Sequence, residues 1–169
     1  MDKQDKLCII IMGVSGVGKT TIGKLLATHN TIPFFDGDDF HSATNITKMS
    51  SGQALNDEDR KYWLESLNTL LIKHSQLQGC VIACSALKES YRKVLNKSVE
   101  KATIFVYLHG SYEVILQRMQ VRQNHFIPTS LLQSQFDTLE IPLDALQISI
   151  ENSPAEIVKI IQTHIENIL

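Results

Sequence analysis

Five short apolar runs alternate along the chain with longer segments of helical periodicity. The runs predict strands at Leu7–Met12, Ile32–Phe35, Cys80–Cys84, Thr103–Leu108 and Leu146–Ile150. Several of them are apolar at every position, which is typical of strands that helices cover on both faces. Helical patterns predict helices at Lys19–Thr28, Asp57–Leu77, Ser90–Val99, Tyr112–Arg122, Ser130–Leu139 and Ala155–Leu169. This alternation predicts an α/β domain with a parallel sheet and right-handed crossovers.

Length and composition fit one globular domain. The 169 residues are 43% hydrophobic and 20% charged, with no repeat or linker, so we expect residues 1–169 to form a single domain. The formal net charge of -2 provides no basic field for nucleic acid or an anionic membrane. Leu7–Met12 is too short to span a bilayer, and Cys8, Cys80 and Cys84 fall in strand-like runs. We therefore expect a cytoplasmic protein with reduced thiols and no nucleic-acid or membrane partner.

The segment GVSGVGKT, residues 13–20, matches G-x-x-x-x-G-K-[ST] between a predicted strand and a predicted helix. Its glycines let the backbone curl and aim N–H groups at a phosphate, and the helix N-terminus adds partial positive charge. Lys19 would reach the β- and γ-phosphates, and the Thr20 hydroxyl would bind Mg²⁺. The predicted nucleoside triphosphate site, extended by one residue, comprises Gly13, Val14, Ser15, Gly16, Val17, Gly18, Lys19, Thr20 and Thr21.

Two classes of function share such a loop. One is a kinase that passes the γ-phosphate to a small molecule, and the other is a nucleotide switch or ATPase. A guanine-specific switch usually needs N-K-x-D, but Asn96 and Lys97 are followed by Ser98 and Val99. The compact chain and the acid cluster described next favour a kinase with an acceptor pocket.

The segment DGDDFHSATNITKM, residues 36–49, follows the second predicted strand and crowds three carboxylates together. Ligands of open α/β sheets bind at that carboxyl edge, so Asp36 could hold Mg²⁺ and Asp38 could act on an attacking hydroxyl. A helix that begins near Asp38 would place four candidate acceptor-site residues on one face, Asp38, His41, Asn45 and Lys48. A solvated helical face is the alternative for this stripe, and helix capping is the alternative for Asp39.

Motifs over nearly the whole chain resemble the small bacterial-type gluconokinases. The resemblance is carried by GVSGVGKTT, DGDDFHSATNITKMSSGQALNDEDRKYWL, VIACSALKESYRKVL, FVYLHG and HFIPTSLLQSQFDTLEIP. The phosphate loop is common to a vast superfamily, whereas the combination of D-G-D-D-x-H, A-C-S-A-L-K-x-x-Y-R and H-F-x-P-x-S-L-L-x-S-Q-F-x-T-L-E is highly specific. Two departures are Gln123 and Asn124, where the family usually has Lys and Gly, and Asn96, where it often has Arg.

The resemblance implies an activity and a fold. The family phosphorylates D-gluconate at its terminal hydroxyl with ATP and Mg²⁺, giving 6-phosphogluconate. It has an adenylate- and shikimate-kinase-like P-loop fold, with a five-stranded parallel sheet of order 2-3-1-4-5, flanking helices and a small lid, and it is commonly a homodimer. A kinase for shikimate or another sugar acid, and a non-catalytic nucleotide-binding regulator, are the alternatives.

Gluconate carries a carboxylate far from its reacting hydroxyl, so its site needs a cation away from the phosphates. Arg60, at the head of the helix predicted over Asp57–Leu77, is one candidate. Lys88 and Arg92, just after the third predicted strand, are the others. Local ion pairs and solvated helical faces are the alternative for all three.

Arg118 and Arg122 are spaced i, i+4 on the helix after the fourth predicted strand. In the resembled fold this helix leads into the lid, so we expect Arg118 near the nucleotide and Arg122 to act in catalysis with Lys19, Asp36 and Asp38. A surface basic pair is the alternative. The polar segment 123–128 is the predicted lid.

Overall fold

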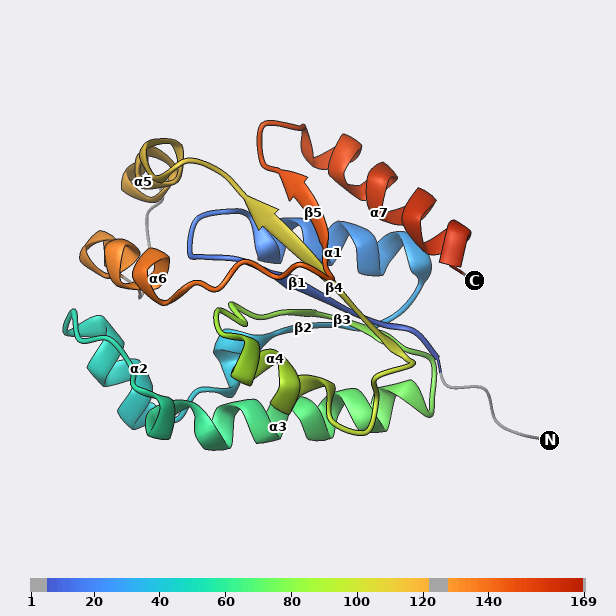
Figure 1. Ribbon diagram of the computed structural model, residues 1–169, viewed down its shortest axis with the longest axis horizontal. Coiled ribbons are helices and arrows are strands. Elements are labelled where there is room, and N and C mark those ends of the chain that lie inside the picture. The colour runs from blue at the N-terminus through green and yellow to red at the C-terminus, as the bar shows by residue number, and fades with distance from the viewer. Residues whose placement is uncertain (1–5, 122–127, 169) are drawn as a thin grey trace.

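The strands form one parallel sheet. The computed structural model describes residues 6–121 and 128–168 (Figure 1). The strands are β1 (Cys8–Met12), β2 (Phe34–Asp36), β3 (Cys80–Ala83), β4 (Thr103–His109) and β5 (Leu146–Ser149). They pair in the order β2-β3-β1-β4-β5, with every pair parallel. This confirms the predicted fold class and strand order.

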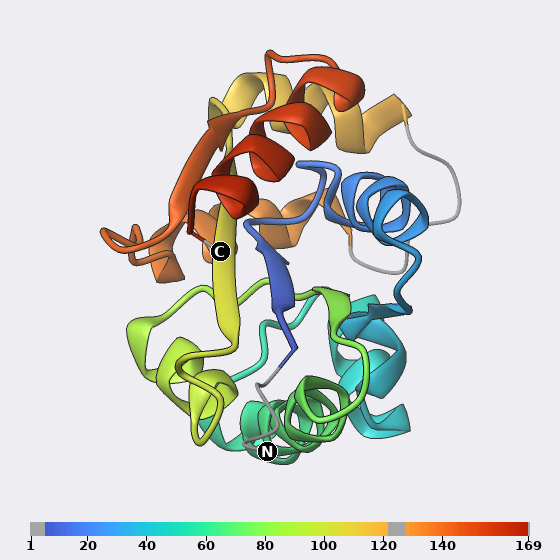
Figure 2. The same ribbon diagram turned by 90° about the vertical axis from the view of Figure 1, so that its right-hand side faces the viewer.

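Helices cover both faces of this sheet. One face carries α1 (Lys19–Asn30), α5 (Tyr112–Val121) and α7 (Pro154–Ile168), and the other carries α3 (Asp57–Ser75) and α4 (Glu89–Asn96). Figure 2 shows the two helical layers on opposite sides of the strands. Residues of β1 alternate between the layers: Ile9 and Ile11 pack with the first group of helices, and Ile10 and Met12 with the second. Burial on both faces explains why β1 is apolar throughout.

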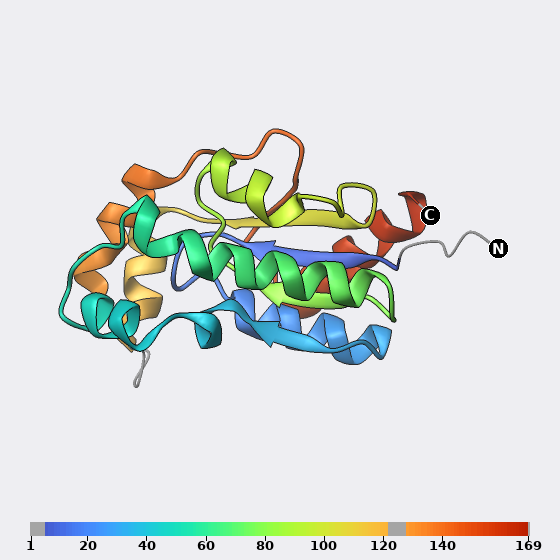
Figure 3. The ribbon, with the colours of Figure 1, turned by 90° about the horizontal axis from the view of Figure 1, so that it is seen from below.

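The carboxyl end of the sheet is where the smaller helices gather. These are α2 (Ala43–Ser50), α6 (Leu132–Thr138) and the 3₁₀ helices η1 (Gly37–Phe40) and η2 (Thr129–Leu131). Figure 3 shows α2, α5 and α6 together at the end of the molecule opposite to both termini. Met49, Leu55 and Leu131 form a small buried cluster that joins the α2–α3 connection to η2. The acceptor side of the predicted site is therefore packed against the segment that leads into α6.

The prediction of one helix beginning near Asp38 is wrong. The chain makes the short helix η1, becomes extended at His41, and begins α2 only after Ser42. Ser42 is the N-cap of α2, and its hydroxyl accepts the Asn45 N–H at 3.1 Å. A Ser at this position favours a new helix start, so the run from Asp38 to Lys48 changes direction and cannot present one face.

Candidate active site

The connection between β1 and α1 forms the predicted phosphate loop. Gly13 has a φ of +139°, and a Cβ there would lie 2.5 Å from the carbonyl oxygen of Leu108, so only glycine fits. The Lys19 ammonium donates to the carbonyl oxygens of Gly13 and Val14, each at 3.0 Å. The side chains of Val14 and Val17 are buried in the core. The loop is thus anchored in the core by its apolar residues, and Lys19 is bonded to its first two carbonyl groups.

Asp36 joins the phosphate loop to the acid cluster. Its Oδ2 accepts the Thr20 hydroxyl at 2.7 Å, and its Oδ1 accepts the Asp38 backbone N–H at 3.1 Å. Gly37 makes this turn possible, because a Cβ there would lie 2.6 Å from the carbonyl oxygen of Ala83. Asp39 is exposed on the other side of η1. The outcome is that Asp36 and Asp38 face the loop and Asp39 does not line the pocket among the described residues.

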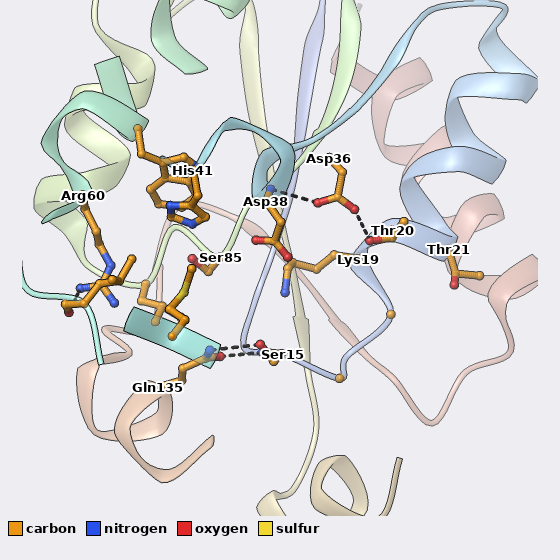
Figure 4. Close-up of a pocket in the computed structure, with 16 residues that line it drawn as sticks. Ser15, Lys19, Thr20, Thr21, Asp36, Asp38, His41, Arg60, Ser85 and Gln135 are labelled. Carbon is orange, nitrogen blue, oxygen red and sulfur yellow. Dashed lines mark hydrogen bonds between the residues drawn. The ribbon is translucent and has the colours of Figure 1, made fainter. Parts of the chain in front are cut away.

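A pocket at this edge brings together predicted residues from distant parts of the chain (Figure 4). In the figure, the Asp38 carboxylate points toward the Lys19 side chain, and Arg60 and His41 lie on the far side of Ser85. The lining includes Ser15, Gly16, Gly18, Lys19, Thr20, Thr21, Asp36, Asp38, His41, Arg60 and Ser85. The pocket therefore joins the predicted phosphate side to the predicted acceptor side, with Asp38 between them.

His41 is held neutral on the acceptor side. Its ring stacks on Trp63 with centroids 4.3 Å apart and planes 15° apart, and the Trp63 Nε1–H donates to the Gly37 carbonyl oxygen at 2.7 Å. Burial, and secondarily the charge of Arg60, lowers the pKa of His41 to about 4. Its Nδ1 is buried without a hydrogen-bond partner among the described residues. A neutral imidazole can exchange hydrogen bonds with a polyol hydroxyl.

Arg60 lines the pocket on the predicted acceptor side and is the candidate cation there. Its Nη1 donates to the carbonyl oxygen of Leu55 and, at 3.3 Å, to the Tyr91 hydroxyl. The Tyr91 hydroxyl in turn donates to Asp57, which also accepts from Lys88 at 2.8 Å. These contacts use one guanidinium nitrogen and hold Arg60 at the pocket, where a fork of N–H donors suits a carboxylate.

Two other predicted acceptor residues are turned toward α3. The Asn45 side-chain amide donates to the backbone carbonyl of Asp59 at 2.7 Å, and the Lys48 ammonium pairs with the Asp59 carboxylate at 2.6 Å. The same carboxylate closes the capping box with Asn56, and the contacts with Lys48 and Asn56 lower the pKa of Asp59. The new helix start at Ser42 is the reason that Asn45 and Lys48 do not line the pocket formed by the described residues.

Lys88 and Arg92 also have contacts other than the pocket. The hydrogen bond to Asp57 raises the pKa of Lys88 and, in return, lowers that of Asp57. Arg92 is buried and donates to the carbonyl oxygens of Ala86 and Leu87, at 2.9 and 3.2 Å. Neither side chain lines the pocket within residues 6–121 and 128–168. Of the three predicted carboxylate cations, the structure brings only Arg60 to the site.

Arg118 and Arg122 are the two arginines that were predicted on the nucleotide side of the site. Arg118 donates to the carbonyl oxygen of Ile150 at 2.9 Å and ties α5 to the end of β5, away from the pocket lining. Arg122 and residues 123–127 of the predicted lid lie outside the described residues. Five residues that also line the pocket were not predicted as site residues: Met49, Leu55, Trp63, Leu87 and Gln135. Of these, Gln135 of α6 contacts Ser15 in the phosphate loop. It lies in the quoted motif S-Q-F, the signal that could have singled it out.

Within the part of the chain that the structure describes, no group of three or more His, Cys, Asp and Glu side chains could hold a metal by itself. Mg²⁺ beside a nucleotide usually takes one or two protein oxygens and completes its shell with phosphates and water. Thr20 and Asp36 supply such oxygens beside the loop.

Within residues 6–121 and 128–168, none of the helices combines the length and the apolar composition that a membrane span requires.

Comparisons with known proteins agree on one group of kinases. The family model for shikimate kinase matches residues 15–160. The chain is 46% identical to the thermosensitive gluconokinase of Escherichia coli, over 88% of this chain and 81% of that protein. It is 44% identical to the gluconokinase of Arabidopsis thaliana, over 95% and 93%. The crystal structure of a gluconokinase from Sinorhizobium meliloti is 40% identical and superposes with a TM-score of 0.81, covering 92% of this chain and 89% of that one. The chain belongs to the gluconokinase family, within the shikimate-kinase-like group of P-loop kinases.

Proposed function

We propose that this kinase transfers the γ-phosphate of ATP to the terminal hydroxyl of D-gluconate, giving ADP and 6-phospho-D-gluconate. The observation that carries the proposal is the arrangement of Lys19, Asp38 and Arg60 around one pocket. Lys19 belongs to the phosphate side, Arg60 offers a guanidinium on the acceptor side, and Asp38 lies between them. A sugar acid, with a hydroxyl at one end and a carboxylate at the other, fits this order. Gluconokinases among the relatives agree with this assignment.

Phosphoryl transfer in this site depends on positioning and charge. The acceptor hydroxyl oxygen forms a bond to the γ-phosphorus, and the bond to the β,γ-bridging oxygen breaks, leaving ADP. Asp38 orients the hydroxyl and accepts its proton. Lys19 exchanges its contacts with the loop carbonyls for phosphoryl oxygens. Mg²⁺, when bound by Thr20 and Asp36, supplies positive charge to the β- and γ-phosphates.

The acceptor side distinguishes the substrate. Arg60 binds the carboxylate through donors not used by Leu55 and Tyr91, and neutral His41 hydrogen-bonds the polyol. A neutral sugar alcohol that fills the pocket would leave the half-buried Arg60 guanidinium shielded from water and without its anion, which costs about 1–3 kcal/mol for a desolvated polar group. We therefore expect kcat/KM for gluconate to exceed that for sorbitol by about 10-fold or more, as this free-energy difference implies.

An ADP-release assay tests the proposal. Purified protein is given ATP and Mg²⁺ with gluconate, other aldonates, sorbitol, shikimate or nucleoside monophosphates, and the phosphorylated product is identified by mass and NMR. Rapid turnover of gluconate to the 6-phosphate supports the proposal. Faster turnover of shikimate or another acid would identify that acid, rather than gluconate, as the acceptor. ATP binding without turnover of any of these compounds would point to a nucleotide-binding regulator. A homodimer, a cytoplasmic location and a single-domain chain stay predictions.

A further inference from the structure

Gln135 closes one end of the phosphate loop from a distant part of the chain. Its Oε1 accepts the Ser15 backbone N–H at 2.6 Å, and its Nε2 donates to the Ser15 hydroxyl at 3.0 Å. The two residues are 120 positions apart. Figure 4 shows both bonds across the pocket from Asp38. Because a backbone N–H can only donate, the amide oxygen must be the atom that faces it, and the pair of bonds fixes the orientation of the side chain.

Helix α6 holds this amide in place by its apolar neighbours. Leu132, three residues earlier, is fully buried in the core cluster that also contains residues of α1 and α5. Phe136, the next residue, packs edge-on against Tyr112 with ring centroids 5.5 Å apart. These two anchors fix the rotation of α6, so that the side of the helix carrying Gln135 faces the loop. The contact is therefore supported by core packing on either side of it.

Ser15 lines the pocket as part of the phosphate loop. It is 6% exposed and follows directly after Gly13 and Val14, whose carbonyl oxygens receive the Lys19 ammonium. The other end of the loop is fixed by the start of α1, where Thr20 bonds Asp36. Gln135 thus restrains Ser15, the loop residue that directly follows the two carbonyl groups bonded by Lys19.

We propose that Gln135 is a positioning residue for phosphoryl transfer. By fixing Ser15, it keeps the loop in the conformation in which the γ-phosphate meets the acceptor hydroxyl. The inference rests on the proposed kinase function. It follows from the physics of this chemistry, in which the protein mainly aligns the reacting atoms and a displacement of about 1 Å can cost on the order of 10²-fold in rate.

Two substitutions of Gln135 separate its possible effects. Gln135→Leu has similar length but removes both hydrogen bonds. Gln135→Glu can keep both, because the Ser15 hydroxyl can donate to a carboxylate, but it places a negative charge beside the terminal phosphate. Gln133 offers matched controls, Gln133→Leu and Gln133→Glu, since it lies exposed on the same helix and bonds only Asp137 among the contacts described.

Single-turnover transfer to gluconate and calorimetric affinities for ATP and ADP are measured for each variant, with a thermal melt to establish folding. We expect Gln135→Leu to slow transfer about 10-fold or more while the Kd for ATP changes less than about threefold. We expect Gln135→Glu to weaken the binding of ATP at least about threefold more than the binding of ADP, because only ATP has the γ-phosphate. Both Gln133 variants should stay within about twofold of wild type.

The inference is overturned if Gln135→Leu transfers phosphate as fast as Gln133→Leu, or if Gln135→Glu affects ATP and ADP equally. Should Gln135→Leu fail to fold, the Glu variant decides through its two affinities. If wild-type protein binds ATP but does not phosphorylate gluconate, the proposed function falls instead. In that case the comparison of ATP with ADP still tests whether Gln135 lies at the γ-phosphate.

Discussion

The Thr20 hydroxyl donates to Asp36 Oδ2 at 2.7 Å, and this contact joins the start of α1 to the end of β2. The second oxygen of the same carboxylate caps η1 through the Asp38 N–H. One side chain thus sets the position of both the phosphate loop and the neighbouring acid. The contact also gathers two oxygens of the kind that Mg²⁺ binds beside phosphates.

Asp36→Asn should raise the Mg²⁺ concentration needed for half-maximal rate, about fivefold or more, because a carboxylate ligand becomes a neutral amide. Asp38→Asn should instead lower kcat on the order of 10²-fold with nearly unchanged ATP affinity, because the acceptor proton loses its base. Titrations of rate against Mg²⁺ at saturating gluconate measure both effects. Asp39→Asn, in the exposed acid of the same cluster, is the control. A Mg²⁺ shift from Asp38→Asn and none from Asp36→Asn would reverse the two roles.

Lys19→Ala should abolish turnover, because the transferred phosphoryl group loses its main protein cation. Lys24→Ala is the matched control, since Lys24 is exposed on the same helix and lies 6.0 Å from the Phe34 ring rather than in the pocket. Single-turnover phosphorylation is the measurement, because it does not depend on product release. If Lys19→Ala retained a tenth of the wild-type rate, the loop would not be the working phosphate site.

Arg60→Met should raise KM for gluconate by about 10- to 100-fold, since a charge-assisted hydrogen bond contributes about 1.5–3 kcal/mol. KM for ATP should stay within about twofold, because Arg60 lies on the acceptor side. Lys61→Met, at the exposed neighbouring position, controls for loss of positive charge on α3. An equal loss with sorbitol as acceptor would show that Arg60 does not bind the carboxylate.

His41 should make the protein less stable in mild acid. Its pKa is near 6.5 unfolded and about 4 folded, so the unfolded state binds the proton first. The stability linked to neutral His41 is complete above pH 6.5 and is lost as the pH falls toward 4. His41→Gln should flatten this dependence by about 2 kcal/mol, a value reduced for partial solvent access. Urea unfolding at stepped pH measures it, with exposed His29→Gln as the control. An unchanged slope in His41→Gln would assign the loss to other groups.

Local pattern was enough to predict the strands of a parallel sheet and the glycine-rich loop between β1 and α1. Apolar runs marked β1 and β3 because strands buried on both faces must be apolar throughout. The glycines and Lys19 of the loop interact within a few residues of each other, so a short motif contains most of their geometry. The place of Asp36 at the end of β2 followed from the same strand pattern.

Tertiary structure decided which polar side chains enter the pocket. Helical spacing grouped Asn45 and Lys48 with Asp38, but the N-cap at Ser42 begins a new helix. Both side chains bond Asp59 of α3 instead. Gln135 reached Ser15 across 120 residues because Leu132 and Phe136 oriented α6 against the core. Periodicity records which face of an element is apolar. The partner of a polar side chain depends on where other elements lie in space, and only packing of the whole chain fixes that.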